Sequence, residues 1–178
     1  MPERIVTDRL ILRKQERGDA PQVRIAVEES HEELRRWLVW AREVPSTDAI
    51  EAYIARNRAA WELREQYMFH LFDYAGRFVG VCGLERIDWD LRGFEIGYWL
   101  RTSSAGKGYM SESVRALGDH AFTAFKARRV MICCDAKNDR SAAIPRRLGY
   151  CLEGILKNER LDANGVPQDT MVWAKTES

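Results

Sequence analysis

The sequence predicts a mixed α/β fold in which helices flank one central sheet. Segments with the two-residue period of strands alternate along the chain with segments that repeat every three to four residues, as helices do. Their order is strand, helix, helix, strand, strand, strand, helix, strand, helix, strand, strand, with no internal repeat and no linker-like stretch. The 178 residues also match the usual size of one domain, so we expect a single unit over residues 1–178.

The first third of the chain is predicted to supply one strand and the helices of one layer. The strand covers residues 10–13, and Asp19 is suited to cap the helix that follows it. Residues 20–41 are expected to form two short helices that meet near Ser30, because residues 30–33 (SHEE) match a capping box; Trp37 would lie in the second. A further helix is expected from Asp48 to near Arg64.

The rest of the chain supplies the remaining strands and two more helices. Residues 67–74 and 78–87 have the pattern of a hairpin, and 94–101 is the next strand. A glycine-containing loop then leads into a helix whose apolar residues fall on one face. The remaining elements are a strand at 130–136, a helix at 138–148 closed by Gly149, and strands at 150–156 and 170–174 joined through Asn164-Gly165.

Composition excludes several classes of partner. The 28 Lys and Arg residues nearly equal the 27 Asp and Glu residues, so the chain lacks the basic excess of nucleic-acid-binding proteins. The four cysteines show no paired short spacing, which predicts reduced thiols, and none combines with His31, His70 or His120 in a metal-ligand pattern. No apolar run reaches the roughly 18 residues of a membrane span. We therefore expect a cytoplasmic protein without a metal and without a membrane partner.

The most informative segment is residues 103–113 (SSAGKGYMSES), which lies between a strand and a helix. Two glycines let the backbone curl so that successive N–H groups point inward, and the N-terminus of the helix adds unpaired donors. A P-loop would need glycine at Arg101 and Ser or Thr at Gly108, and a dinucleotide fingerprint would need glycine at Ser111. The segment is therefore either an anion cradle of another kind or a tight turn.

The pattern x-G-x-G-x-x at residues 105–110 resembles the pyrophosphate loop of the GNAT superfamily of N-acetyltransferases. Four further stretches are similar to signatures of its RimJ/RimL-type members, in the same order: TDRLILR (7–13), FEIGYWL (94–100), NDRSAAIPRRLGY (138–150) and LEGILKN (152–158). The resemblance implies a GNAT-like fold, with a mostly antiparallel sheet of about seven strands and a splay between the fourth and fifth. It also implies acetyl-CoA as the acetyl donor. Residues 35–48 are most similar to ribosomal-protein-serine acetyltransferases.

The resemblance also implies which residues contact the cofactor. The loop departs from the family pattern at Ala105, usually Gln or Arg, so that Arg101 or Lys107 would supply the missing contact. An N–H near Leu100 would receive charge from the thioester oxygen. The implied cofactor residues are Trp99, Leu100, Arg101, Ala105, Gly106, Lys107, Gly108, Tyr109, Met110, Asn138, Ser141 and Arg147.

Three residues are candidates for proton transfer. Glu95 shares a strand face with Trp99 and is our candidate base; the alternative is a partly buried carboxylate in a structural ion pair, and Glu159 is the rival base. Ser141 matches the family serine that protonates the leaving thiolate, but a serine in that position also serves as a local helix cap. Pro145 would leave the Ser141 carbonyl without its helical partner.

The acceptor is less constrained than the donor. Trp37 and Trp40 lie on the early segments that wall the acceptor cleft in this family, although helically spaced aromatic residues more often belong to the core. Our leading hypothesis is acetylation of a protein N-terminus, with Glu95 also facing the substrate. The alternatives are acetylation of a small amine, namely a polyamine, an aminoglycoside or an aminoacyl nucleotide, and a CoA-binding sensor without turnover. The sequence leaves the oligomeric state open, although similar proteins often form homodimers.

Overall fold

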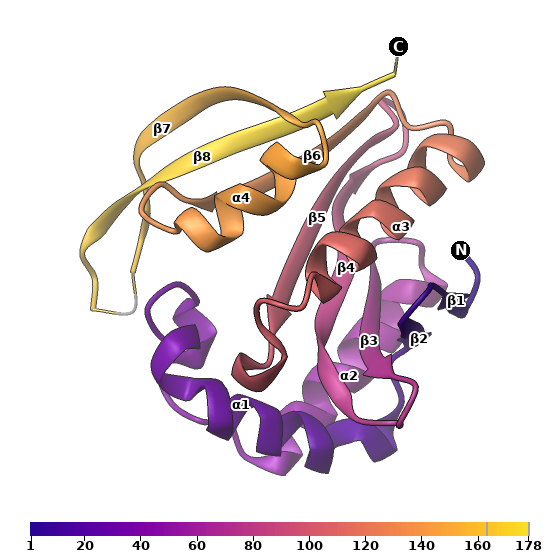
Figure 1. Cartoon of the computed structure of the whole chain (residues 1–178), viewed down its shortest axis with the longest axis vertical. Helices are drawn as coiled ribbons and strands as arrows, with labels where there is room; N and C mark the ends of the chain where they lie inside the picture. The colour runs from indigo at the N-terminus through magenta and orange to yellow at the C-terminus, as the bar shows by residue number, and fades with distance from the viewer. Residues whose placement is uncertain (163, 178) are drawn as a thin grey trace.

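The computed structural model, which describes residues 1–162 and 164–177, contains one sheet with the strand order β1-β2-β3-β4-β5-β6-β8-β7 (Figure 1). Every neighbouring pair is antiparallel except β5 and β6. The strands are β1 (Arg4–Val6), β2 (Leu10–Lys14), β3 (Tyr67–Asp73), β4 (Phe78–Asp88), β5 (Gly93–Leu100), β6 (Arg129–Asp135), β7 (Cys151–Leu161) and β8 (Pro167–Thr176).

Two pairs of helices cover the sheet. Helices α1 (Ala20–Leu34) and α2 (Thr47–Glu62) precede β3, whereas α3 (Tyr109–Ala124) and α4 (Asp139–Arg147) flank β6 in the chain. Side chains alternate across β3, β4 and β5, so that Phe69, Cys82 and Ile96 join the core under α3 while Phe78 and Val81 join the core under α1 and α2. None of the helices in the described part of the chain is long and apolar enough to span a lipid bilayer.

The sheet opens in its middle, between β5 and β6. The two strands pair in parallel only at Gly93 with Arg129, Phe94 with Val130 and Glu95 with Met131. Beyond Glu95, β5 pairs only with β4, and β6 continues with β8 alone. Figure 1 shows the two strands diverging from this short contact. The splay predicted between the fourth and fifth strands is therefore confirmed. The sheet has eight strands instead of the predicted seven or so, and the additional strand is β1.

One continuous helix replaces the two short helices expected over residues 20–41. Helix α1 runs through the SHEE stretch without a break, and only a single 3-10 turn, Val39–Ala41, follows it; Trp37 lies in the connecting turn. The Ser30 hydroxyl does not cap a helix. Its Oγ accepts a hydrogen bond from the Thr102 backbone N–H at 2.9 Å, which ties α1 to the segment after β5. The capping-box interpretation was wrong because this serine makes a tertiary contact.

The starts of helices α1 and α2 also differ from their predictions. Asp19 makes no cap bond to α1; its carboxylate instead lies 2.6 Å from Nδ1 of His70 on β3 and 2.6 Å from Nη2 of Arg13 on β2. Helix α2 starts at Thr47, one residue before the predicted Asp48, because Ser46 accepts from the Ala49 N–H at 3.2 Å. It ends at Glu62, close to the expected boundary.

Candidate active site

The loop between β5 and α3 has the geometry of an anion cradle. Gly106 and Gly108 adopt left-handed φ values of +76° and +79°, which let the backbone curl without a side-chain clash. Gly108 caps α3, and no side chain satisfies this end of the helix. Within the described ranges, the N–H groups of residues 108–111 donate to no protein acceptor. Four unpaired donors at the positive end of a helix dipole fit a diphosphate.

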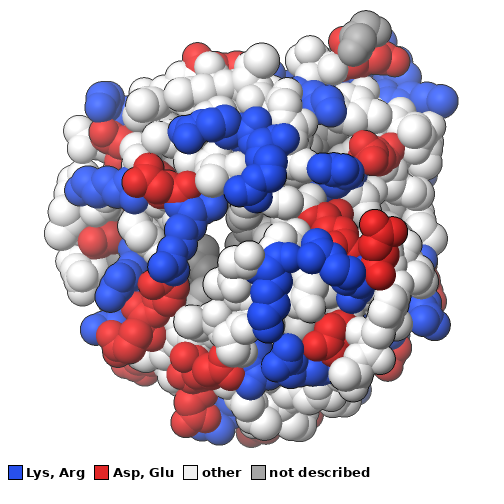
Figure 2. All heavy atoms as spheres, viewed as in Figure 1, with Lys and Arg blue, Asp and Glu red and all other residues white. Residues whose placement is uncertain are grey.

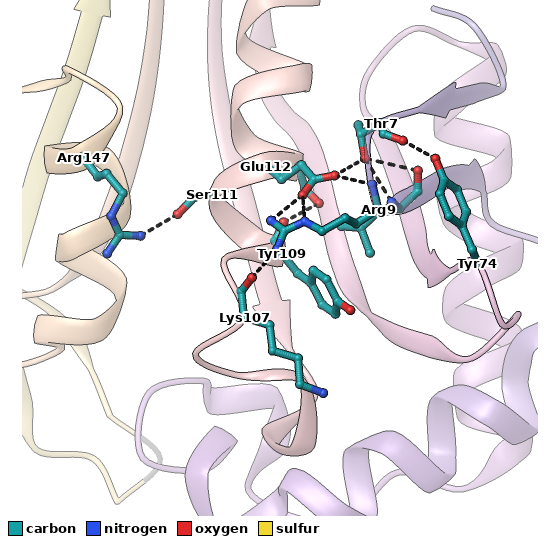
Figure 3. Close-up of polar contacts among 10 residues, drawn as sticks. Thr7, Arg9, Tyr74, Lys107, Tyr109, Ser111, Glu112 and Arg147 are labelled. Atoms are coloured by element: carbon teal, nitrogen blue, oxygen red, sulfur yellow. Dashed lines mark hydrogen bonds and ion pairs between the residues drawn. The ribbon is translucent and has the colours of Figure 1, made fainter.

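Three cations predicted near this loop have different surroundings. Arg101 is held by α1: its Nε donates to Glu29 Oε2 at 2.7 Å, and this bond, together with the Ser103 N–H, lowers the pKa of Glu29 to about 2. Arg147 Nη1 donates to Ser111 Oγ at 2.9 Å and so connects α4 to α3. The Lys107 side chain is exposed and extends away from Arg9 (Figure 3). Of the two cations suggested to compensate for Ala105, only Lys107 is therefore without a carboxylate partner in the described residues.

Lys and Arg side chains gather around a hollow on this side of the molecule. Figure 2 shows Lys and Arg side chains bordering a hollow on the face that is viewed in Figure 1, with Asp and Glu lying mainly outside the hollow. A polyanion entering there meets both the main-chain donors of the loop and a favourable surface potential. Both features fit the phosphates of acetyl-CoA.

Tyr98 and Ser141 lie across the splay from each other. Tyr98 extends from β5 on the α3 side of the sheet, and its hydroxyl lies 3.1 Å from Ser141 Oγ and 3.2 Å from the Ser141 carbonyl oxygen on α4. Asn138 Oδ1 caps α4 by accepting from the Ser141 N–H at 3.0 Å. Cys134 on β6 interacts with the same serine. These residues place hydroxyl and thiol groups where the two halves of the sheet separate.

Glu95 lies on the opposite face, at the last paired position before the splay. Its side chain shares this face with Trp99, which packs in the α1 and α2 core, and the residue is only 6% exposed. Burial raises the pKa of Glu95, although Arg86 opposes the shift. Arg86 Nη1 forms an ion pair with Glu95 Oε2 at 3.3 Å, as the structural alternative for this carboxylate predicted, and Oε2 has no hydrogen-bond partner among the described residues. Glu95 thus keeps one oxygen with unused hydrogen-bond acceptor capacity.

A second carboxylate adjoins Glu95. Glu85 on β4 is directly opposite Glu95 in the register, and burial followed by repulsion from Glu95 raises the pKa of Glu85. Its Oε1 fills the space over Gly97, where an added Cβ would lie 2.3 Å away. The absence of a side chain at Gly97 thus makes room for this carboxylate.

The rival base Glu159 and the two predicted acceptor tryptophans have different surroundings. Glu159 on β7 accepts from Thr170 Oγ1 at 2.8 Å, and its charge contributes to the raised pKa of Glu95. Trp40 packs on Trp99, with ring centroids 5.9 Å apart. Trp37 lies in the turn after α1, where its Nε1 is 3.5 Å from Glu33 Oε1. Trp40 is therefore the tryptophan that reaches the face of β5 carrying Glu95.

Sequence reasoning missed three polar residues in this region. Tyr98 alternates with Glu95 along β5 and was not assigned a role, although Pro145 indicated that the Ser141 carbonyl needed a new donor. Glu85 gave no local signal, because its partner follows it by ten residues on another strand. Arg9 lies in the TDRLILR stretch, yet its contact with Lys107 depends on the folded chain.

The fold and the site together define an acyltransferase that takes its acyl group from a CoA thioester. The family model described as "Acetyltransferase (GNAT) domain" matches residues 9–150, and the chain belongs to this family. It is thus an N-acetyltransferase that uses acetyl-CoA. No group of three His, Cys, Asp or Glu residues in the described ranges is arranged to hold a metal ion.

Individual relatives point to one branch of the family. The ribosomal-protein-serine acetyltransferase of Escherichia coli (strain K12) is 30% identical over 142 residues, which cover 80% of this chain and 78% of that protein. The RimL ribosomal L7/L12 α-N-protein acetyltransferase was solved with coenzyme A in a disulfide with one of its cysteines; it superposes with a TM-score of 0.90 at 28% identity, covering 97% of this chain and 96% of that one. An acetyltransferase from Salmonella typhimurium, described as modifying the N-terminal serine of L7/L12, has a TM-score of 0.87 at 26% identity and covers 98% of both chains.

Proposed function

We propose that this enzyme acetylates the N-terminal α-amine of a protein, most specifically a ribosomal protein, by direct attack of the amine on acetyl-CoA in a ternary complex. The observation that supports this most directly is the Glu95 carboxylate at the point where β5 leaves β6, whose buried Oε2 has no hydrogen-bond partner in the part of the chain that the structure describes. A donor bound on the α3 side and an acceptor on the Glu95 side would meet through this opening. The relatives named above, whose acceptors are ribosomal proteins, support the choice of acceptor.

The cofactor phosphates are proposed to lie on the loop of residues 105–110. The unpaired N–H groups at the start of α3 bind the diphosphate, and Lys107 adds a cation in place of the side chain that Ala105 lacks. The pantetheine arm then runs between β5 and β6, where unpaired strand groups near Trp99, Leu100 and Asn138 bind its amides. Arg147 stays on Ser111 and borders this path.

The acceptor amine is proposed to meet Glu95. An α-amine has a pKa of about 7.7 to 8.0, so part of it is neutral at pH 7 and the base has only to remove the proton released during attack. Glu95 accepts that proton directly or through a water molecule, and its raised pKa suits the task. Trp40 borders the approach to this carboxylate from the α1 side.

The leaving thiolate is proposed to take a hydrogen bond from Ser141. The Ser141 hydroxyl lies 3.1 Å from the Tyr98 hydroxyl, which holds it in place. A relative whose cofactor forms a disulfide with one of its cysteines shows that the CoA sulfur can lie beside a cysteine in this family. In this chain Cys134 adjoins Ser141, which supports placing the sulfur there.

Release of free CoA thiol with a panel of acceptors tests the proposal. Peptides that begin with Ser, the same peptides with a blocked N-terminus and one internal lysine, spermidine and an aminoglycoside would each be added with acetyl-CoA. We expect thiol release only with the free N-terminal peptides, and mass spectrometry should locate the acetyl group on the α-amine. Faster release with spermidine or the aminoglycoside would identify a small-amine enzyme instead. Thermal stabilisation by acetyl-CoA without release in any reaction would identify a sensor.

A further inference from the structure

We infer that Arg9, in the turn between β1 and β2, is a positioning residue for the cofactor loop: it fixes the orientation of the peptide bond between Lys107 and Gly108. The inference rests on the proposed binding of the diphosphate to this loop. It concerns a residue more than ninety positions away from the loop in the sequence, which we do not place in contact with the reacting atoms.

The Arg9 guanidinium bridges the loop and the first turn of α3 (Figure 3). Its Nη1 donates to the Lys107 carbonyl oxygen at 2.7 Å, and its Nε donates to Glu112 Oε2 at 2.7 Å. The Arg9 backbone N–H also donates to Glu112, at 2.9 Å from Oε1. The guanidinium lies over the ring of Tyr109, 5.2 Å from its centroid. The N–H donors of the Arg9 guanidinium thus connect the loop, through Lys107, to helix α3, through Glu112.

Glu112 is in turn held by the same β1–β2 turn. Thr7 Oγ1 donates to Glu112 Oε1 at 2.6 Å, and the Tyr74 hydroxyl donates to the Thr7 carbonyl. Burial alone would raise the pKa of Glu112, but the hydrogen bonds from Thr7 and Arg9 outweigh it and lower the pKa. Glu112 is therefore ionised at neutral pH, and the charge of Arg9 is largely balanced by this partner.

Without Arg9, the peptide bond between Lys107 and Gly108 could rotate so that its carbonyl and its N–H exchange directions. Gly108 has a φ of +79°, and glycine accepts positive and negative φ at similar cost, so its preceding peptide can rotate easily. In a trans peptide the carbonyl and the N–H point in opposite directions. Because the Lys107 carbonyl points to Arg9, the Gly108 N–H points away from Arg9, as a free donor. A reversed peptide would present a carbonyl oxygen to the diphosphate instead.

Substitutions at Arg9 can separate orientation from charge. Lysine keeps the charge but has one ammonium group in place of the planar fork, so Arg9→Lys cannot hold Glu112 and the Lys107 carbonyl in the same way. Arg9→Ala removes both. The matched controls are Arg77→Lys and Arg77→Ala, because Arg77 also pairs with a carboxylate, Asp73, and its side chain is 45% exposed against 50% for Arg9.

Calorimetric titration with CoA, together with kinetics, measures the effect. We expect both Arg9 variants to weaken CoA binding and raise the KM for acetyl-CoA about tenfold, the size expected when one hydrogen-bonded contact is lost. The kcat at saturating acetyl-CoA should stay within about twofold of the native value, because the reacting groups are untouched. Acetyl-pantetheine, which has no diphosphate, should keep its KM, and the Arg77 controls should bind CoA normally.

Three results would overturn the inference. Full rescue by Arg9→Lys would show that charge alone matters, and an equal loss with acetyl-pantetheine would show general damage to the site. Unchanged CoA affinity in Arg9→Ala, while the Gly108 amide resonance of the native protein shifts on CoA addition, would remove the role of Arg9 and leave the loop as the cofactor site. A Gly108 resonance that does not respond to CoA in the native protein would instead contradict the proposed cofactor site itself.

Discussion

The hydroxyl of Tyr98 donates to the Ser141 carbonyl oxygen at 3.2 Å, across the opening between β5 and α4. The carbonyl is available because the residue four positions later is Pro145, which has no N–H to complete the helical bond. Ser141 thus has its carbonyl and its Oγ within reach of one phenol. Pro145, inside the short helix α4, thus leaves a carbonyl acceptor to which Tyr98 on β5 donates.

Removing either hydroxyl of this pair should slow acetyl transfer. We expect Tyr98→Phe and Ser141→Ala each to lower kcat by roughly tenfold, because a positioned proton donor to the thiolate is lost. The double variant should lose little more than one single variant, since the two hydroxyls act as one unit. Steady-state kinetics with a Ser-starting peptide measures this. Strictly multiplicative losses, or unchanged kcat in Ser141→Ala, would contradict the assignment.

Glu95→Gln should lower kcat/KM for the acceptor about a hundredfold through loss of a general base. In the native enzyme, two groups must lose protons: the amine, with a pKa of about 7.7 to 8.0, and Glu95, whose pKa is raised above its ordinary value. The logarithm of kcat/KM should therefore rise with slope two at low pH and with slope one between the two pKa values. The lower break should vanish in Glu95→Gln.

Glu159→Gln distinguishes the two candidate bases. The Glu159 charge raises the pKa of Glu95, so neutralising it should move the lower break of the same pH profile to lower pH. The plateau rate should be retained, because Glu95 remains in place. A lost break in Glu159→Gln, with a normal profile in Glu95→Gln, would make Glu159 the base.

Gly106→Ala should weaken CoA binding by more than its effect on stability explains. Gly106 has a φ of +76° with nothing within 4 Å of an added Cβ, so alanine costs backbone strain of about 1 kcal/mol without a clash. Gly76, in the β3–β4 turn, has the same φ and the same open surroundings and is the matched control. Both variants should lose similar unfolding free energy in urea, and only Gly106→Ala should raise the KM for acetyl-CoA. Equal KM values for acetyl-CoA in the two variants would contradict the assignment of this loop as the cofactor site.

Asp19→Asn should destabilise the fold by about 2 kcal/mol, which is the difference between its ordinary pKa and its folded value converted to free energy. Burial opposes ionisation, but hydrogen bonds from His70, Glu16 and Arg13 lower the pKa of Asp19 from 3.8 to about 2. Burial lowers the pKa of His70, although its contact with Asp19 opposes the shift.

The direction of the Asp19 pKa shift determines the pH range over which its contribution to stability is lost. A carboxyl with a depressed folded pKa stabilises fully above 3.8, and this contribution is lost as the pH falls to about 2. Urea unfolding should therefore show a constant gap between native and variant protein near neutral pH, closing over that range. Glu28→Gln, which affects an exposed pair with Arg24, should cost less than about 1 kcal/mol. A pH-independent gap down to pH 2 would contradict the role of Asp19.

The sequence predicted most of the fold because its periods change clearly from helix to strand. It missed β1, whose three residues are too few to show alternation. It divided α1 at Ser30 because a capping box is a local pattern, whereas the hydroxyl of Ser30 bonds the distant Thr102. Such errors arise where a residue that usually bonds its own backbone finds a tertiary partner instead.

The candidate site was predictable where it lies on one segment. Alternation along β5 placed Glu95 and Trp99 on one face, and the two glycines located the loop. Partners separated in the chain could not be found in this way. The pairing of Arg101 with Glu29, for example, follows from how α1 packs beside the end of β5.

In the described residues, the two halves of the sheet are joined by three parallel residue pairs between β5 and β6 and by the adjacent bond from the Arg128 N–H to the Arg92 carbonyl. A ligand bound in the opening between β5 and β6 forms hydrogen bonds that the two strands cannot form with each other, and it thereby bridges the two halves of the sheet. Substrate loading should thus stiffen the C-terminal half of the molecule, with slower amide exchange in β6 and β8.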